Sequence, residues 1–165
     1  MDIKANIYNV AKISLLPTGY APVMDTIFSG LWYMAAPLAM YFVPTPGSGT
    51  IGELLASIVE MAIGGQWGAL TVLEGLIQGA TNEIGFFPKK SRYQAFSWSS
   101  VLTGAFFASI GGFVPSYFLY GWYKYSIDLQ IVMFITGVIS SLVFDVVLVK
   151  LITNLFERSL KPVIQ

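Results

Sequence analysis

The sequence predicts an all-α integral membrane protein, an antiparallel bundle of hydrophobic helices. Of its 165 residues, 55% are hydrophobic and only 11% are charged, whereas soluble domains average roughly 25% charged residues. The mean hydropathy is +0.68. Apolar segments such as 131–144 are also too long and too uniformly apolar for the alternating strands, about 10 residues each, of a membrane β-barrel. Helices are therefore the expected way of spanning the bilayer.

Five membrane spans are predicted, because a helix needs about 20 mostly apolar residues to cross a bilayer. They cover residues 22–43, 51–63, 67–87, 96–120 and 128–155. The second segment is short, so it has to begin near Ser48 or lie in a thinned or interior position. Pro37 and Pro115 are expected to bend the first and fourth spans. Short connections favour antiparallel neighbours, and residues 1–165 are predicted to form a single transmembrane domain.

The positions of lysine and arginine predict the orientation. More of them lie in the 88–95 connection and after the last span than on the opposite side. The first group is Lys89, Lys90, Arg92, Arg158 and Lys161, and the second is Lys4, Lys12 and Lys124. The C-terminus is therefore expected to be cytoplasmic. Five spans with an outer N-terminus and no signal peptide are unusual, so we expect a sixth, N-terminal span that is missing from this chain, with residues 5–16 as its interfacial remnant.

Composition and motifs argue against several kinds of chemistry. Cysteine and histidine are both absent, which excludes disulfides, zinc–thiolate sites and an imidazole base. The glycine-rich segment 44–50 lacks the lysine and the βα unit of a phosphate-binding loop, so it is expected to be a turn. We predict neither an enzyme nor a cofactor. Active transport would need energy from another subunit, because the sequence has no motif for nucleotide hydrolysis.

Acidic residues within the predicted spans are the main functional signal. There are six of them, Asp25, Glu53, Glu60, Glu74, Glu83 and Asp145, whereas Lys150 is the only basic residue well inside a span. Each charge at the bilayer centre costs roughly 2.5–3.5 kcal/mol on insertion scales. The carboxyl groups should therefore face the protein interior or a wet cavity. A bound cation, protons or neighbouring hydrogen-bond donors would have to neutralise them.

Helical spacing brings several of these residues toward one depth. Glu53 and Glu60 are seven residues apart and share a helix face. Glu74 and Gln78 share a face of the next span, with Asn82 beside it. The predicted ligand-binding residues are Glu60, Glu74, Gln78, Trp32, Trp67, Tyr33, Asn82, Glu53 and Glu83. Carboxylates, amides and aromatic rings together would suit a flat organic cation that enters from outside.

A structural role is the competing interpretation of these acidic residues. An intramembrane Glu side chain can be protonated and hydrogen-bonded without contacting a ligand. For Glu53, Glu83 and Asp145, a structural role and ligand contact are equally favoured. Tyr120, Trp122 and Tyr123 are interpreted as part of the interfacial aromatic belt. Small residues four apart, such as Gly75 and Gly79, are expected to let neighbouring helices approach closely.

The order of spans and polar residues resembles the substrate-binding S components of energy-coupling-factor (ECF) vitamin transporters. Within them it is similar to the YkoE group, assigned to thiamin or its hydroxymethylpyrimidine precursor. The resemblance covers about residues 20–155 and is most specific in the run GLIQGATNE at 75–83. The other resembling residues are Gly30-Leu31-Trp32, Pro46-Gly47, Gly52-Glu53-Leu54, Glu60 and Phe86.

The resemblance implies a six-helix subunit of a prokaryotic plasma membrane that binds one vitamin molecule from outside. Its implied partners are a transmembrane coupling subunit and two ATPase subunits, and no nucleic acid. Ligand contacts carry over to Glu60, Glu74, Gln78 and Trp32. Two alternatives stay open. One is a self-sufficient proton-coupled transporter of small cations or drugs, which would work in vesicles without partners. The other is a non-transporting assembly protein, in which the carboxyl groups are structural.

Overall fold

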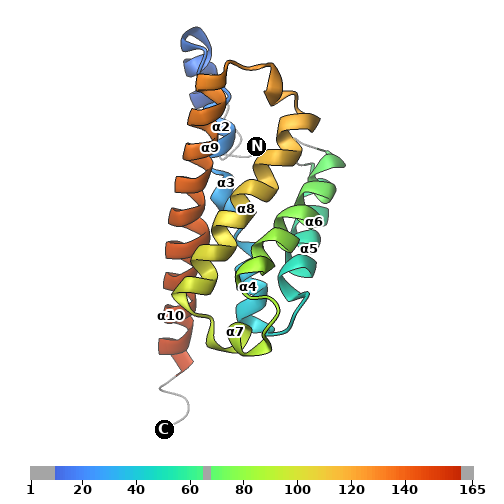
Figure 1. Ribbon diagram of the computed structural model, residues 1–165, viewed down its shortest axis with the longest axis vertical. Helices are drawn as coiled ribbons and strands as arrows, with labels where there is room; N and C mark the ends of the chain where they lie inside the picture. Colours follow the sequence, from blue (N-terminus) through green and yellow to red (C-terminus); the bar gives the residue numbers. More distant parts are fainter. Residues whose placement is uncertain (1–9, 65–67, 161–165) are drawn as a thin grey trace.

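Helices form every regular element in residues 10–64 and 68–160, which the computed structural model describes, and no strand occurs among these residues. This confirms the predicted all-α membrane class. The bundle is elongated (Figure 1), with the 3-10 helix η1 (Leu16–Thr18) and α2 (Val23–Ile27) at one end. Helix α7 (Lys90–Ala95) and the end of α10 (Val149–Leu160) lie at the other end.

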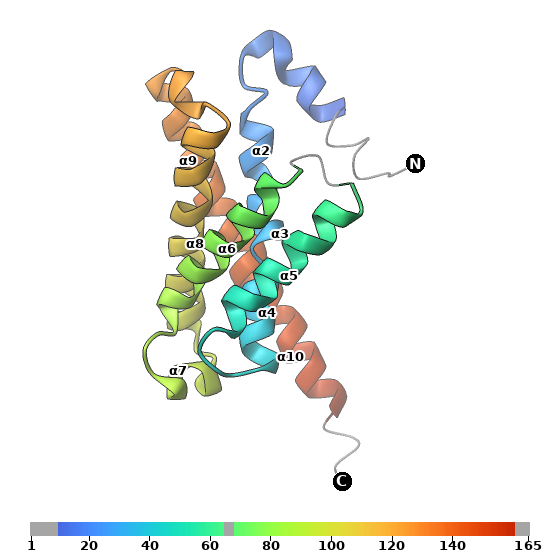
Figure 2. The same ribbon diagram turned by 90° about the vertical axis from the view of Figure 1, so that its right-hand side faces the viewer.

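The first predicted span, 22–43, is not one helix but three. Helices α2, α3 (Ser29–Trp32) and α4 (Ala35–Phe42) follow one another along the bundle (Figure 2). The expected bend at Pro37 is replaced by interruptions before α3 and before α4, and Pro37 itself lies within the first turn of α4. A proline is well tolerated there, because the first turn of a helix has no intrahelical partners for its N–H groups.

Side chains from other helices satisfy the backbone groups that these interruptions release. The Ser140 hydroxyl donates to the Ile27 carbonyl at 2.7 Å and accepts from the Gly30 N–H at 3.0 Å. At the second interruption the Glu53 carboxyl accepts from the Ala36 N–H, at the start of α4, at 2.8 Å. Non-helical backbone at membrane depth persists only where such partners exist. Side chains of other helices therefore stabilise the interruptions of the first span.

Helices α5 (Ser48–Ala62) and α6 (Leu70–Asn82) pack side by side (Figure 2), and α6 continues into the 3-10 turn η2 (Glu83–Gly85). Helix α5 begins at Ser48, as predicted from the short length of the apolar segment 51–63. Both helices are shorter than the roughly 20 residues of a full span. Between the two helices, Gly64 and Gly68 adopt left-handed conformations, with φ of 87° and 61°. Residues 68 and 69, which were predicted to be helical, therefore belong to a turn.

Two helices of the described residues are long and apolar enough to cross a membrane. One is α8 (Trp98–Leu119), which contains Pro115 without interruption. The other runs continuously from Ile127 to Leu160. It consists of α9 (Ile127–Ser141), the π-helical segment η4 (Leu142–Leu148) and α10. The prediction of single helices over 22–43 and 67–87 is thus corrected, because shorter helices build these two segments. The second segment, predicted to be short, is the 15-residue helix α5.

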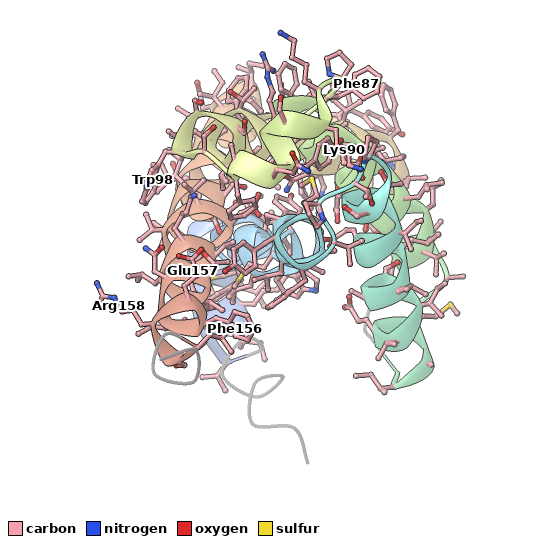
Figure 3. The ribbon with its side chains drawn as sticks, turned by 90° about the horizontal axis from the view of Figure 1, so that it is seen from below. Phe87, Lys90, Trp98, Phe156, Glu157 and Arg158 are labelled. Carbon is pink, nitrogen blue, oxygen red and sulfur yellow. The ribbon has the colours of Figure 1, made fainter. Side chains whose placement is uncertain are left out.

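The connections hold short helices that the sequence did not predict. Helix α7 occupies most of the 88–95 connection, and the 3-10 helix η3 (Trp122–Lys124) lies between α8 and α9. Seen from below in Figure 3, Lys90 and Arg158 lie at the same end of the bundle. The 88–95 connection and the end of the last helix, which carry the described basic residues of the first group, therefore lie at one end of the bundle.

Buried apolar side chains form two clusters. The first joins α4, α7, α8 and the π segment through residues that include Met40, Tyr93, Val101 and Val146. The second joins α2, η3 and α9 through Val23, Trp122 and Met133. Packing in these clusters fixes the helices that carry the polar residues described next.

Candidate ligand-binding site

A cavity of about 240 Å³ lies among the helices, and residues of α2 and η3 contribute to its lining. Residues of α2, α3, α5, α6, α8 and α9 form its wall. Four carboxyl groups line it, from Asp25, Glu53, Glu60 and Glu74. So do six aromatic side chains, from Trp32, Tyr33, Phe113, Tyr120, Trp122 and Phe134. Within the described ranges, no lysine or arginine belongs to this wall. The cavity is therefore acidic and aromatic.

Two hydroxyl groups hold the carboxyl group of Glu74. One belongs to α8, and the other belongs to the residue that follows α8. Ser116 donates to Oε1 at 2.8 Å and Tyr120 donates to Oε2 at 2.9 Å. The Glu74 side chain is 8% exposed. One donor on each oxygen fixes the plane of the carboxyl group while lone pairs remain for another partner. The carboxyl group of Glu74 is therefore preorganised on the cavity wall.

Glu60 is positioned by an aromatic residue of α3. The Trp32 indole N–H donates to Glu60 Oε1 at 3.2 Å, and both side chains are half-buried. Trp32 is the last residue of α3, directly before the second interruption of the first span. The broken backbone thus places an indole ring and a carboxyl group together on the same wall.

Asp25 differs from the other acidic residues of the cavity because a lysine meets it. The Lys12 ammonium lies 2.7 Å from Oδ1 and 3.0 Å from Oδ2 of Asp25. This is the ion pair found in the described part of the chain. The expectation that basic residues would not balance the carboxyl groups therefore fails for Asp25. Glu53, Glu60 and Glu74 have no ion pair within the described residues.

Thr71 adds a polar atom that the sequence analysis overlooked. It lies on the cavity wall, one turn before Glu74 on α6, and is 7% exposed. Its buried hydroxyl oxygen has no hydrogen-bond partner among the residues that the structure describes. Such an atom costs about 1–3 kcal/mol when it stays unsatisfied. A polar group of a bound ligand would remove that cost.

The structure places six of the nine predicted site residues together on this wall, namely Trp32, Tyr33, Glu53, Glu60, Glu74 and Gln78. Asn82 and Glu83 do not line the cavity. The Asn82 amide donates to Asp145 Oδ2 at 3.0 Å inside the bundle. Trp67 lies outside the described residues.

Glu83 instead joins three segments at the α7 end of the bundle. Its carboxyl group accepts from the N–H groups of Gly47 and Thr50, both at 2.8 Å, and from the Tyr93 hydroxyl at 3.1 Å. Burial, followed by the charge of Glu83, raises the pKa of Tyr93 above its usual value, so the hydroxyl stays a donor. Glu83 therefore caps the start of α5, where the helix dipole favours a negative charge.

Broken and short membrane helices, joined by side-chain caps around an acidic cavity, define a helical membrane protein. The chain belongs to the family of permease components of ABC-type cobalt transport systems, whose model matches residues 3–111. It is therefore a membrane-embedded transporter component.

Two further comparisons found one protein of similar sequence and one of similar fold. The chain is 26% identical over 124 residues to the putative HMP/thiamine permease protein YkoE of Bacillus subtilis (strain 168), which covers 75% of this chain. It spans 59% of the length of that relative. Its fold is similar to a crystal structure of an S component of an ECF transporter, with a TM-score of 0.77 and 21% identity. That match covers 96% of this chain and 87% of the other.

Proposed function

We propose that this protein is the substrate-binding S component of an ECF-type importer, and that it captures thiamin or hydroxymethylpyrimidine from outside the cell. A transmembrane coupling subunit and two ATPase subunits would supply the energy. The similarity in fold to an S component and the similarity in sequence to the putative HMP/thiamine permease of Bacillus subtilis support this proposal. The proposal also places the chain in a prokaryotic plasma membrane, with the basic end that carries Lys90 and Arg158 in the cytoplasm.

The observation that carries the proposal is the charge of the cavity wall. Glu53, Glu60 and Glu74 line one cavity together with several aromatic rings, and none of the three has an ion pair among the described residues. Carboxyl groups in a low-dielectric interior need a compensating partner. A cationic ligand would be that partner, and aromatic rings attract a cation through their faces.

The chemistry of thiamin is complementary to this wall. Its thiazolium ring carries a permanent positive charge, and its aminopyrimidine ring carries an exocyclic amine. Glu74 has lone pairs left for an N–H donor, and the Thr71 hydroxyl lacks a partner. The Trp32 indole, fixed by Glu60, offers a face for stacking. The cavity volume of about 240 Å³ is slightly below the usual range for small-molecule sites, about 300–1,000 Å³.

Isothermal titration of the purified protein in nanodiscs tests this proposal. We expect thiamin to bind at one site per chain with a dissociation constant below about 1 μM, near −8 kcal/mol. Hydroxymethylpyrimidine tests the contribution of the aminopyrimidine ring alone. Biotin and riboflavin, which lack the thiazolium charge, serve as controls and should give no heat. A correctly folded protein that binds neither thiamin nor its precursor would contradict the proposal.

A further inference from the structure

Asp145 is a fully buried carboxyl group that the proposed binding site does not use. It lies in the π-helical segment between α9 and α10 and has 0% exposure. The Asn82 amide N–H donates to its Oδ2 at 3.0 Å. Asn82 itself is 1% exposed. The two side chains thus join α6 to the last helix inside the bundle.

The remaining oxygens of this pair lack hydrogen-bond partners. Four buried side-chain atoms of the described residues are unsatisfied, and two of them are Asn82 Oδ1 and Asp145 Oδ1. Both are acceptors if Asp145 is ionised, so neither can satisfy the other. A single proton on Asp145 Oδ1 creates an O–H donor that the amide oxygen can accept. In a reciprocal pair of acid and amide, two hydrogen bonds would be exchanged and both atoms would be satisfied.

In the described part of the chain, the surroundings of Asp145 offer no positive charge to an ionised carboxylate. Helices α3 and α8 pack against the π segment and contain no charged residue. A second acid, Glu53, acts on Asp145 electrostatically. Lys150 follows on α10, but its ammonium donates to the Phe96 carbonyl and lies 4.5 Å from the centre of the Phe96 ring. A neutral acid is the form that these neighbours favour.

A metal ion fits the pair less well than a proton does. Among the described residues, no group of three or more histidine, cysteine, aspartate or glutamate side chains could hold a metal ion. The backbone of Gly104 packs closely against Asn82, and a Cβ atom at this position would lie 2.6 Å from Asn82 Oδ1. A hard cation needs several oxygen ligands and the space to hold them. A proton needs neither.

We propose that Asp145 is a proton-binding site, a carboxylic acid kept neutral at physiological pH in a reciprocal pair with Asn82. The pair also positions the cavity. Asn82 follows the wall residue Gln78 by one turn of α6, and Asp145 follows the wall residue Gly137 by about two turns. The protonated pair therefore links the two helices that carry these wall residues. This inference does not depend on which ligand the cavity binds.

Infrared spectroscopy of protein labelled with ¹³C-carboxyl aspartate tests the proton directly. Replacing Asp2, Asp25 and Asp128 by Asn leaves Asp145 as the only labelled carboxyl group. We expect the carbonyl stretch of a protonated acid at neutral pH, shifted by the ¹³C label. A spectrum with only the carboxylate stretches would overturn the proposal. This test requires no change at position 145.

Substitutions at position 145 provide a second test. In Asp145→Asn, the new amide can donate to Asn82 Oδ1 and accept from Asn82 Nδ2, which reproduces the neutral pattern. We expect its unfolding midpoint to stay within about 2 °C of the natural protein. Asp145→Ala should lower the midpoint by about 4–10 °C, because it leaves the buried amide unpaired. If Asp145→Asn loses as much as Asp145→Ala, the acid is needed in its charged form and the proposal fails.

Discussion

Replacing Glu74 by Gln should weaken thiamin binding about 30- to 100-fold, which corresponds to about 2–3 kcal/mol. The substitution keeps the size of the side chain and removes its negative charge. Glu74 is buried on the cavity wall and its plane is fixed by Ser116 and Tyr120. A charge-assisted contact in such a site is worth about 1.5–3 kcal/mol. Hydroxymethylpyrimidine, which lacks the thiazolium charge, should lose less affinity than thiamin.

Glu157→Gln is the matched control for this experiment. It makes the same chemical change on α10, where Glu157 accepts from the Tyr41 hydroxyl at 3.1 Å and does not line the acidic cavity. Titration calorimetry at one ionic strength should give the natural affinity for this variant. Equal affinities for Glu74→Gln and the natural protein, with both folded, would remove Glu74 from the site.

Replacing Gly79 by Val should lower the unfolding midpoint by about 6–12 °C, the effect of about 3 kcal/mol. A Cβ atom at this position would lie 2.8 Å from Glu53 Cβ, 2.8 Å from Thr50 Cα and 3.0 Å from the Gly49 carbonyl oxygen. Two of these three atoms belong to the backbone of α5, so they cannot move aside without shifting the helix. Because Glu53 would be displaced, ligand binding should weaken as well.

The neighbouring residue provides the control for this prediction. Ala80→Val adds the same kind of side chain one position later, on the exposed face of α6. Its midpoint should change by less than about 2 °C. Thermal unfolding followed by circular dichroism in the same detergent compares the two variants. A similar midpoint for both would mean that the close approach of α5 and α6 does not depend on Gly79.

Much of the cavity could be predicted from helical spacing. Glu53 and Glu60 are seven residues apart, and Glu74 and Gln78 are four apart, so each pair shares one face of its helix. The excess of carboxyl groups over basic residues indicated that those faces turn inward. These arguments need only a helix and its period. They hold even though α6 is shorter than the predicted span of 67–87.

Contacts between helices could not be derived in the same way. Ser116 and Tyr120 are four residues apart, which is a signal that they share a face, but nothing local shows that this face meets Glu74. The interfacial belt explained Tyr120 and Trp122 equally well. Glu83 is five residues from Gln78, which turns it away from the cavity toward the N–H groups at the start of α5. Such partners depend on tertiary packing.

The interruptions in the first span had the weakest local signal. Residues 22–43 are apolar enough for one continuous helix, and Pro37 suggested a bend at the wrong place. Ser140 and Glu53 compensate the actual breaks. Ser140 lies 110 residues from Gly30, and Glu53 lies 17 residues from Ala36. A break that depends on remote partners leaves little trace in its own sequence. For the same reason, the ion pair of Lys12 with Asp25 was not expected.

Mass spectrometry of the small molecule that stays bound during purification tests the central claim most directly. The cavity carries three carboxyl groups that lack an ion pair within the described residues, so its guest should bring a positive charge and a flat ring. We predict that denaturing the natural protein releases thiamin or a related aminopyrimidine, and that Glu74→Gln retains much less of it. Release of an anionic compound instead, in equal amounts from both proteins, would contradict the account.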